Sequence, residues 1–107
     1  MSISIEYLQK YIRSKDHDPA RKEQYFLKLS EEVGELARAM HRNMRPESAG
    51  QIKGTVEEEL WDVIYYVIAL ANLYDIDLES VIPLKEKVNN DRYNKGVIFG
   101  AEIAEDR

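Results

Sequence analysis

Thr55-Val56-Glu57-Glu58-Glu59-Leu60-Trp61-Asp62, continuing directly into the apolar run from Val63 to Leu73, is the stretch that decides the fold of this chain. Thr55 followed three residues later by Glu58 matches a capping box, the pairing that opens an α-helix. From Val63 to Leu73 only Asn72 is strongly polar, and a helix that is apolar on nearly every side is buried on nearly every side. The stretch predicts a buried helix that ends near Tyr74.

A second helix is predicted upstream of this stretch. Asp18-Pro19 supplies a capping oxygen and a proline suited to the first helical position. The helix should continue to about Met44, because apolar residues recur there every three or four positions. Between the two helices, Arg45 to Gly54 reads as a loop. The recurring apolar residues, which predict one buried stripe, are Phe26, Leu29, Val33, Leu36 and Met40.

Two further helices flank this pair. The first is predicted from Ser4 to Lys15, where apolar side chains recur at helical spacing. The last should run from Asp77 to about Asn94, with Pro83 bending it or breaking it early. Neither strand alternation nor an internal repeat is present. We therefore predict a single all-α domain over residues 1–107, a four-helix, bundle-like subunit.

Acidic residues occur in two matched pairs, Glu32 with Glu35 and Glu59 with Asp62. Each pair is spaced i, i+3, so each places two carboxylates on one helical face, where like charges repel. Bringing the two pairs together requires a positive charge between them. Because every ligand offered is a carboxylate, a hard divalent cation fits best, and Mg²⁺ is the cation we predict.

Helical-wheel positions place these acids beside the apolar stripes. On the later helix the stripe is formed by Leu60, Ile64, Val67 and Ala71, and both acidic pairs fall on the flank of the stripe of their own helix. Two helices packed antiparallel through their stripes would bring the pairs face to face across a shallow groove. That is the geometry a shared metal cluster needs.

Composition restricts the function classes. The chain has 107 residues, of which 33% are charged and 44% apolar, a soluble globular balance and neither a disordered nor a membrane one. The net charge of −5 argues against binding to a nucleic-acid polymer. The absence of cysteine excludes disulfides and thiolate metal sites. The amino terminus lacks the pattern of a secretory signal, so a cytoplasmic protein is expected.

Two motifs carry a resemblance to a known family. Glu31-Glu32-Val33-Gly34-Glu35-Leu36, a spacer and Glu58-Glu59-Leu60-Trp61-Asp62-Val63 resemble the EExxE…ExxD signature of the MazG-like, all-α nucleoside triphosphate pyrophosphohydrolases. The resemblance covers roughly Gln24 to Tyr93. It implies Mg²⁺ ligation by the four paired acids, and hydrolysis of a nucleoside triphosphate to monophosphate and pyrophosphate, an activity that could clear unwanted nucleotides from the pool. It also implies a homodimer or a homotetramer.

The remaining site residues follow from this mechanism. One further acid must take the proton of the attacking water, and the candidates are Glu31, which could instead be a further metal ligand, and, behind it, Glu58. The last predicted helix carries cationic and amide groups that could bind phosphate oxygens, in a pattern that resembles the KxxxN…RY segment of the same family. The predicted substrate contacts are Lys53, Lys85, Asn89, Arg92 and Tyr93.

Burial of the apolar helix raises the question of assembly. A small subunit cannot easily cover every side of it, so Tyr65, Ile68, Ala69 and Trp61 are predicted to meet a second subunit across a two-fold axis. In the alternative, the first helix of the same chain covers this surface. Aromatic residues Trp61, Tyr65 and Tyr66 could also stack on a nucleobase.

Two other function classes stay open. The chain could be a helical domain that binds nucleotide and metal without turnover. It could also be a plain helical oligomerisation module whose acids only confer solubility.

Overall fold

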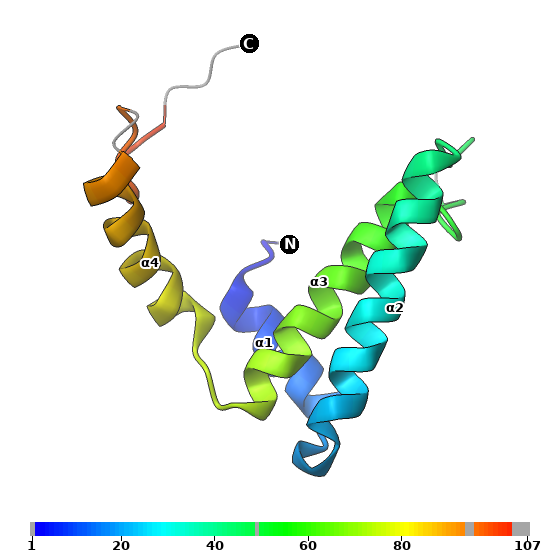
Figure 1. Cartoon of the computed structure of the whole chain (residues 1–107), viewed down its shortest axis with the longest axis horizontal. Coiled ribbons are helices and arrows are strands. Elements are labelled where there is room, and N and C mark those ends of the chain that lie inside the picture. The colour runs from blue at the N-terminus through cyan, green and yellow to red at the C-terminus, as the bar shows by residue number, and fades with distance from the viewer. Residues whose placement is uncertain (1, 49, 94–95, 104–107) are drawn as a thin grey trace.

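The computed structural model describes residues 2–48, 50–93 and 96–103, and no strand occurs among them. The helices are α1 (Ile5–Lys15), α2 (Lys22–His41), α3 (Val56–Leu73) and α4 (Leu78–Tyr93), with a 3-10 turn η1 (Pro19–Arg21) before α2 (Figure 1). The all-α prediction is confirmed. None of the described helices has the length and the hydropathy that crossing a membrane requires.

Side-chain caps start α1, α3 and α4 where the sequence predicts them, whereas α2 begins only at Lys22, after the Asp18-capped turn η1, and ends at His41 instead of near Met44. The Ser4 hydroxyl accepts a hydrogen bond from the Tyr7 amide at 3.0 Å and opens α1. Thr55 Oγ1 accepts from the Glu58 amide at 3.3 Å and opens α3, and Asp77 accepts from the Glu79 amide at 3.1 Å before α4. Each of these bonds satisfies an N–H group that has no partner within its helix.

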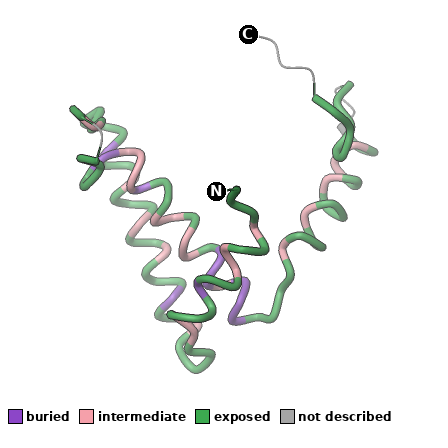
Figure 2. Tube along the Cα trace, turned by 180° about the vertical axis from the view of Figure 1, so that it is seen from behind, coloured by how far each residue is buried: buried purple, intermediate pink, exposed green. Residues whose placement is uncertain are grey.

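The long helices α2 and α3 form an antiparallel hairpin, and α1 packs against α3 near the end of the hairpin where α2 begins (Figure 1). From there α4 runs away from the hairpin and contacts α1 (Figures 1 and 2). The predicted break at Pro83 does not occur, since α4 is continuous through it. Pro83 lies in the second turn, so its missing N–H removes only one early helical bond.

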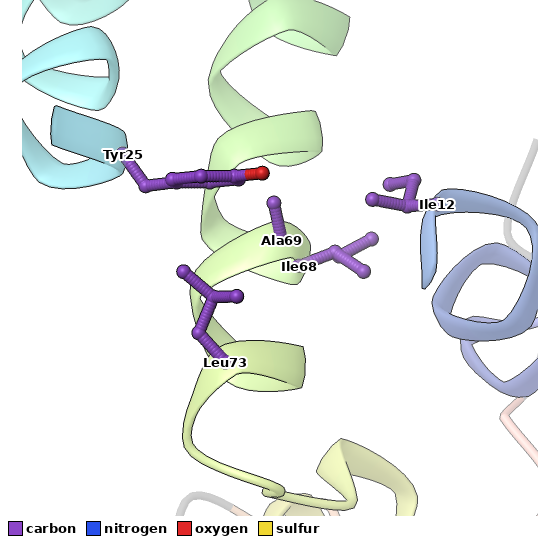
Figure 3. Packing of buried hydrophobic residues seen from close by; sticks show 5 residues of the cluster. All are labelled: Ile12, Tyr25, Ile68, Ala69 and Leu73. Carbon is purple, nitrogen blue, oxygen red and sulfur yellow. The ribbon is translucent and has the colours of Figure 1, made fainter. Parts of the chain in front are cut away.

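The core is small and lies where α1 crosses the hairpin. Figure 3 shows its members pointing toward one another from three helices, and Figure 2 shows most buried positions gathered in this region. The prediction that Ile68 and Ala69 face a second subunit is wrong, because each is only 1% exposed within one chain. The alternative is confirmed for these two residues, because α1 of the same chain covers them. The core residues are Ile12, Tyr25, Ile68, Ala69 and Leu73.

The hairpin packs only in part through the predicted stripes, because Leu29 and Leu36 on α2 are half-buried and Ala71 on α3 is 7% exposed. The other members of the two stripes are 44% to 61% exposed: Phe26, Val33 and Met40 on α2, and Leu60, Ile64 and Val67 on α3. We call these six residues the apolar face. They share one side of the hairpin, because a groove joins Phe26 to Tyr74, which continues the α3 stripe by two turns. The two helices meet through Leu29, Leu36 and the flanking positions, which include the acids.

Asp16, at the end of α1, ties three helices together. Its two carboxylate oxygens accept hydrogen bonds from the phenols of Tyr25 on α2 and Tyr65 on α3, the latter at 2.7 Å. Burial, followed by the hydrogen bond to Asp16, raises the pKa of Tyr25 to about 12, so the phenol stays a donor at neutral pH.

Tyr65→Phe should therefore lower the free energy of unfolding by about 1–3 kcal/mol, the range for a hydrogen bond to a charged group. Tyr11→Phe is the matched control, because the exposed Tyr11 hydroxyl only accepts from the exposed Lys15, and its loss should change stability by less than about 0.5 kcal/mol. Urea unfolding of the two variants measures the difference. Equal midpoints would show that the Asp16 cluster adds nothing to the packing of α1.

Candidate metal centre

Three carboxylates converge between α2 and α3. Glu32 on α2 meets Glu59 and Asp62 on α3, and one oxygen from each lies within 4.8 Å of the other two. Because the helices are antiparallel, the middle of α2 faces the first two turns of α3, where the positive end of the helix dipole favours ionised acids. We call these three residues the carboxylate cluster.

Glu59 is the buried member of the cluster. Glu59 is only 8% exposed, and its Oε2 atom has no hydrogen-bond partner among the described residues. Burial raises the pKa of Glu59 to about 7, and the adjacent Glu32 carboxyl and the charge of Asp62 add to the shift. An acid in this position is costly to ionise unless a cation stands beside it.

Asp62 lies at the half-buried edge of the cluster. Burial and the charge of Glu58 raise the pKa of Asp62, while Glu32 and the ammonium of Lys53 act in the opposite direction. Lys53, a predicted substrate contact, therefore stands within electrostatic reach of the cluster. It precedes α3 in a turn where Gly54 has a φ of +78°, a left-handed conformation that glycine adopts without strain.

Glu35 and Glu31 point to cations of their own helix. The Glu35 carboxylate lies 3.6 Å from Arg38, and the Glu31 carboxylate lies 3.3 Å from Lys28. Both side chains are about half exposed or more. Of the four predicted metal ligands, the structure brings together three, and Glu35 stays a prediction as the fourth.

Glu58 combines a structural and an electrostatic role. Its Oε1 atom accepts a hydrogen bond from the Gly54 amide at 2.7 Å, which helps to hold the turn before α3. Its charge also raises the pKa of both Glu59 and Asp62, so Glu58 acts directly on the cluster. The neighbouring Glu57 is turned away and pairs with Arg45.

The other predicted substrate contacts lie on α4, away from the cluster (Figure 1). Asn89 donates a hydrogen bond to Glu86 of the same helix at 2.6 Å, and the Tyr93 side chain lies outside the described residues. Within one chain α4 packs on α1. A contact between Lys85, Asn89 or Arg92 and the cluster thus requires a second copy of the chain or another position of α4, and these three stay predictions.

The cluster fits a hard divalent cation. Three carboxylates supply only oxygen ligands, the donor type that Mg²⁺ and Ca²⁺ prefer, and the unpartnered Glu59 Oε2 is an oxygen that a cation would satisfy. Mg²⁺ usually keeps several waters and takes few protein ligands, so three carboxylates leave coordination positions for a substrate.

Four residues near the cluster were not predicted from the sequence to contact phosphate. Arg21, Gln24, Lys28 and Tyr66 line a pocket of about 240 Å³ together with Asp16 and Tyr25. The signal was present in the spacing, because Lys28 precedes Glu32 by four positions and Tyr66 follows Asp62 by four. Only the packing of α2 against α3 shows that these two faces meet.

The chain is similar to known proteins in sequence and in fold. The MazG nucleotide pyrophosphohydrolase domain family matches residues 20–95 of the chain. Two crystal structures of iMazG from Vibrio DAT 722 are similar to it. One, with a carboxyl-terminal tag, shares 42% sequence identity with a TM-score of 0.77, over 82% of this chain and 99% of the other. The amino-terminally tagged form shares 41% identity with a TM-score of 0.78, over 87% and 100%.

A curated relative is similar over a shorter range. The uncharacterised protein YpjD of Bacillus subtilis (strain 168) is 40% identical over 55 residues, which are 50% of this chain and 50% of that protein. The chain thus matches about half the length of this relative, whose activity is not described by its name.

Proposed function

The chain belongs to the MazG nucleotide pyrophosphohydrolase family, and from this membership we propose that it hydrolyses nucleoside triphosphates to monophosphate and pyrophosphate with Mg²⁺ as cofactor. The observation that carries the proposal is the carboxylate cluster. Glu32, Glu59 and Asp62 converge from two helices, and the buried Glu59 has an oxygen without a partner among the described residues. An oligomerisation module has no need for such an arrangement, which destabilises the protein when no cation is bound.

The chain's own residues then have distinct tasks. The cluster holds the cation, and Lys53, near Asp62, binds a phosphate oxygen of the substrate. Water attacks the α-phosphorus, the bond between that phosphorus and the bridging oxygen breaks, and pyrophosphate leaves. Glu58, whose charge acts on Glu59 and Asp62, and Glu31 are the candidates for the acid that takes the proton of the water. When bound, Mg²⁺ neutralises triphosphate charge and stabilises the charge that develops on the departing pyrophosphate.

The proposal extends to a homodimer built on the apolar face. The apolar side chains of Phe26, Val33 and Met40 on α2 and of Leu60, Ile64 and Val67 on α3 are 44% to 61% exposed, and monomeric proteins rarely leave a large apolar patch in water. A two-fold axis through it would pack two hairpins into a larger helical bundle. The pocket beside the cluster includes Asp16, the residue after α1, so we expect it to open on another side of the hairpin and to stay accessible.

The experiment is a turnover screen of canonical, deoxy and modified nucleoside triphosphates, with separate detection of pyrophosphate and orthophosphate. We expect release of pyrophosphate in Mg²⁺ and none after chelation, with at least one nucleotide preferred. Release of orthophosphate would contradict cleavage at the α-phosphorus. Binding of nucleotide and Mg²⁺ without turnover of any substrate would instead support a non-catalytic binding domain.

A further inference from the structure

The pocket lined by Arg21, Gln24, Lys28 and Tyr66 adjoins the carboxylate cluster. Lys28 lies one helical turn before Glu32 on α2, and Tyr66 lies one turn after Asp62 on α3. One turn of four residues advances about 6 Å along a helix. Because the two helices are antiparallel, both steps lead in the same direction along the groove between them.

The pKa shifts of Lys28 and Tyr66 are consistent with this arrangement. The pKa of Lys28 is raised chiefly by Glu31, and the charges of Tyr66 and Glu32 act in the same direction. Burial raises the pKa of Tyr66, with Lys28 opposing the shift and Glu32 and Asp62 adding to it. The charges of Lys28, Glu32 and Asp62 all reach Tyr66, as expected for a pocket one helical turn from the cluster.

The pocket is cationic despite the aspartate in its wall. Both carboxylate oxygens of Asp16 accept hydrogen bonds from the phenols of Tyr25 and Tyr65, and its one negative charge is exceeded by the two positive charges of Arg21 and Lys28. The guanidinium of Arg21 has no hydrogen-bond or ion-pair partner among the described residues. Lys28 is held only by an ion pair with Glu31 that is at least half exposed, and such pairs are weak enough to be exchanged for a ligand.

The beginning of α2 adds to this potential. Its cap residue, Arg21, makes no side-chain capping bond, so the first N–H groups of a 20-residue helix contribute positive potential beside the pocket. The volume of about 240 Å³ is below the roughly 300–1,000 Å³ of sites that enclose a drug-sized ligand. The pocket therefore suits one end of a nucleotide and not the whole molecule.

We propose that this pocket binds the terminal, pyrophosphate end of the triphosphate, with Arg21 and Lys28 as the positioning cations. This inference rests on the proposed function for the position of the α-phosphate at the carboxylate cluster. One helical turn is about the span of two phosphoanhydride links, so a substrate whose α-phosphate lies at the cluster places its last phosphate beside Lys28. Gln24 supplies an amide donor between the two cations along α2.

The test uses inorganic pyrophosphate with Mg²⁺ as the probe and isothermal titration calorimetry as the measurement. In Lys28→Gln and in Arg21→Gln, pyrophosphate should bind about ten- to a hundredfold more weakly, the loss expected for one charge-assisted hydrogen bond. The affinity for a panel of nucleoside monophosphates should change less than about threefold. Lys10→Gln is the control, because Lys10 also forms an exposed ion pair, with Glu6 on α1, and should leave both affinities unchanged.

The outcomes separate the subsite from the enzyme. Weaker binding of monophosphates with unchanged binding of pyrophosphate would overturn the inference, because the pocket would then hold the nucleoside end. Unchanged binding of both ligands would overturn it as well. A wild-type chain that hydrolyses nothing, yet binds pyrophosphate in a manner dependent on Lys28, would reject the proposed function and leave the subsite standing.

Discussion

Glu59→Gln is expected to abolish Mg²⁺-dependent hydrolysis and, at the same time, to stabilise the metal-free protein. Glutamine keeps the shape of the side chain and removes the charge that a cation requires. Because a metal supplies several kcal/mol of transition-state stabilisation, turnover should fall by about 100-fold or more. Steady-state release of pyrophosphate and calorimetric binding of Mg²⁺ measure the loss.

The stabilising effect follows from the burial of Glu59. Its pKa of about 7 in the metal-free protein is higher than the value of about 4.3 for an unperturbed glutamate. The raised pKa stabilises the folded state fully below pH 4.3, and this contribution is lost as the pH rises to about 7. With chelator present, Glu59→Gln should therefore exceed the wild type in free energy of unfolding at pH 8 by about 1–3 kcal/mol. Near pH 5 the two proteins should be similar.

Glu57→Gln is the matched control on the same turn of α3. Glu57 pairs with Arg45, and this ion pair lowers the pKa of Glu57, the opposite of the shift at Glu59. The control should therefore keep Mg²⁺ binding and turnover, and it should not stabilise the protein at pH 8. If Glu59→Gln were less stable than the wild type at pH 8 in chelator, the Glu59 carboxylate would have protein partners that satisfy its charge, and the metal centre would lose its support.

The features of this structure that the sequence predicts are those set by residues close together in the chain. The caps at Ser4, Thr55 and Asp77 involve residues within a few positions of one another, so the helix starts follow from the sequence. The convergence of Glu32 with Glu59 and Asp62 was also accessible, because each pair occupies a known position relative to the apolar residues of its helix.

The packing faces were not accessible in the same way. Both long helices carry more apolar residues than one contact can cover, and a pattern of apolar and polar residues does not distinguish a core from a surface that awaits a partner. Exposed members of the stripes, such as Val33 and Ile64, were therefore wrongly predicted to lie in the contact between α2 and α3. Glu35 turns to Arg38, a local ion pair that competes with the cluster. The course of α4 depends on a short turn in which Asp75 has a φ of +54°, and helical periodicity carries no information on it.

Ile64→Glu should separate the proposed dimer into monomers. Ile64 lies in the middle of the α3 half of the apolar face and is 45% exposed in the single chain. In a two-fold dimer the substitution would place two carboxylates, one from each copy, within the same apolar contact, where an unpaired charge is strongly destabilising. The dissociation constant should rise by about 100-fold or more, as measured by sedimentation equilibrium.

Leu84→Glu is the control that identifies the surface. Leu84 on α4 is even more exposed, at 69%, but it lies outside the apolar face, so this variant should remain a dimer. Dissociation by Leu84→Glu alone would place the subunit contact on α4 instead. The Ile64→Glu monomer should still bind Mg²⁺, because Glu32, Glu59 and Asp62 all come from one chain. Any accompanying loss of turnover would support the prediction that Lys85 and its neighbours on α4 contact the substrate across the dimer, because the cation site and the pocket at Arg21 and Lys28 both lie within one chain.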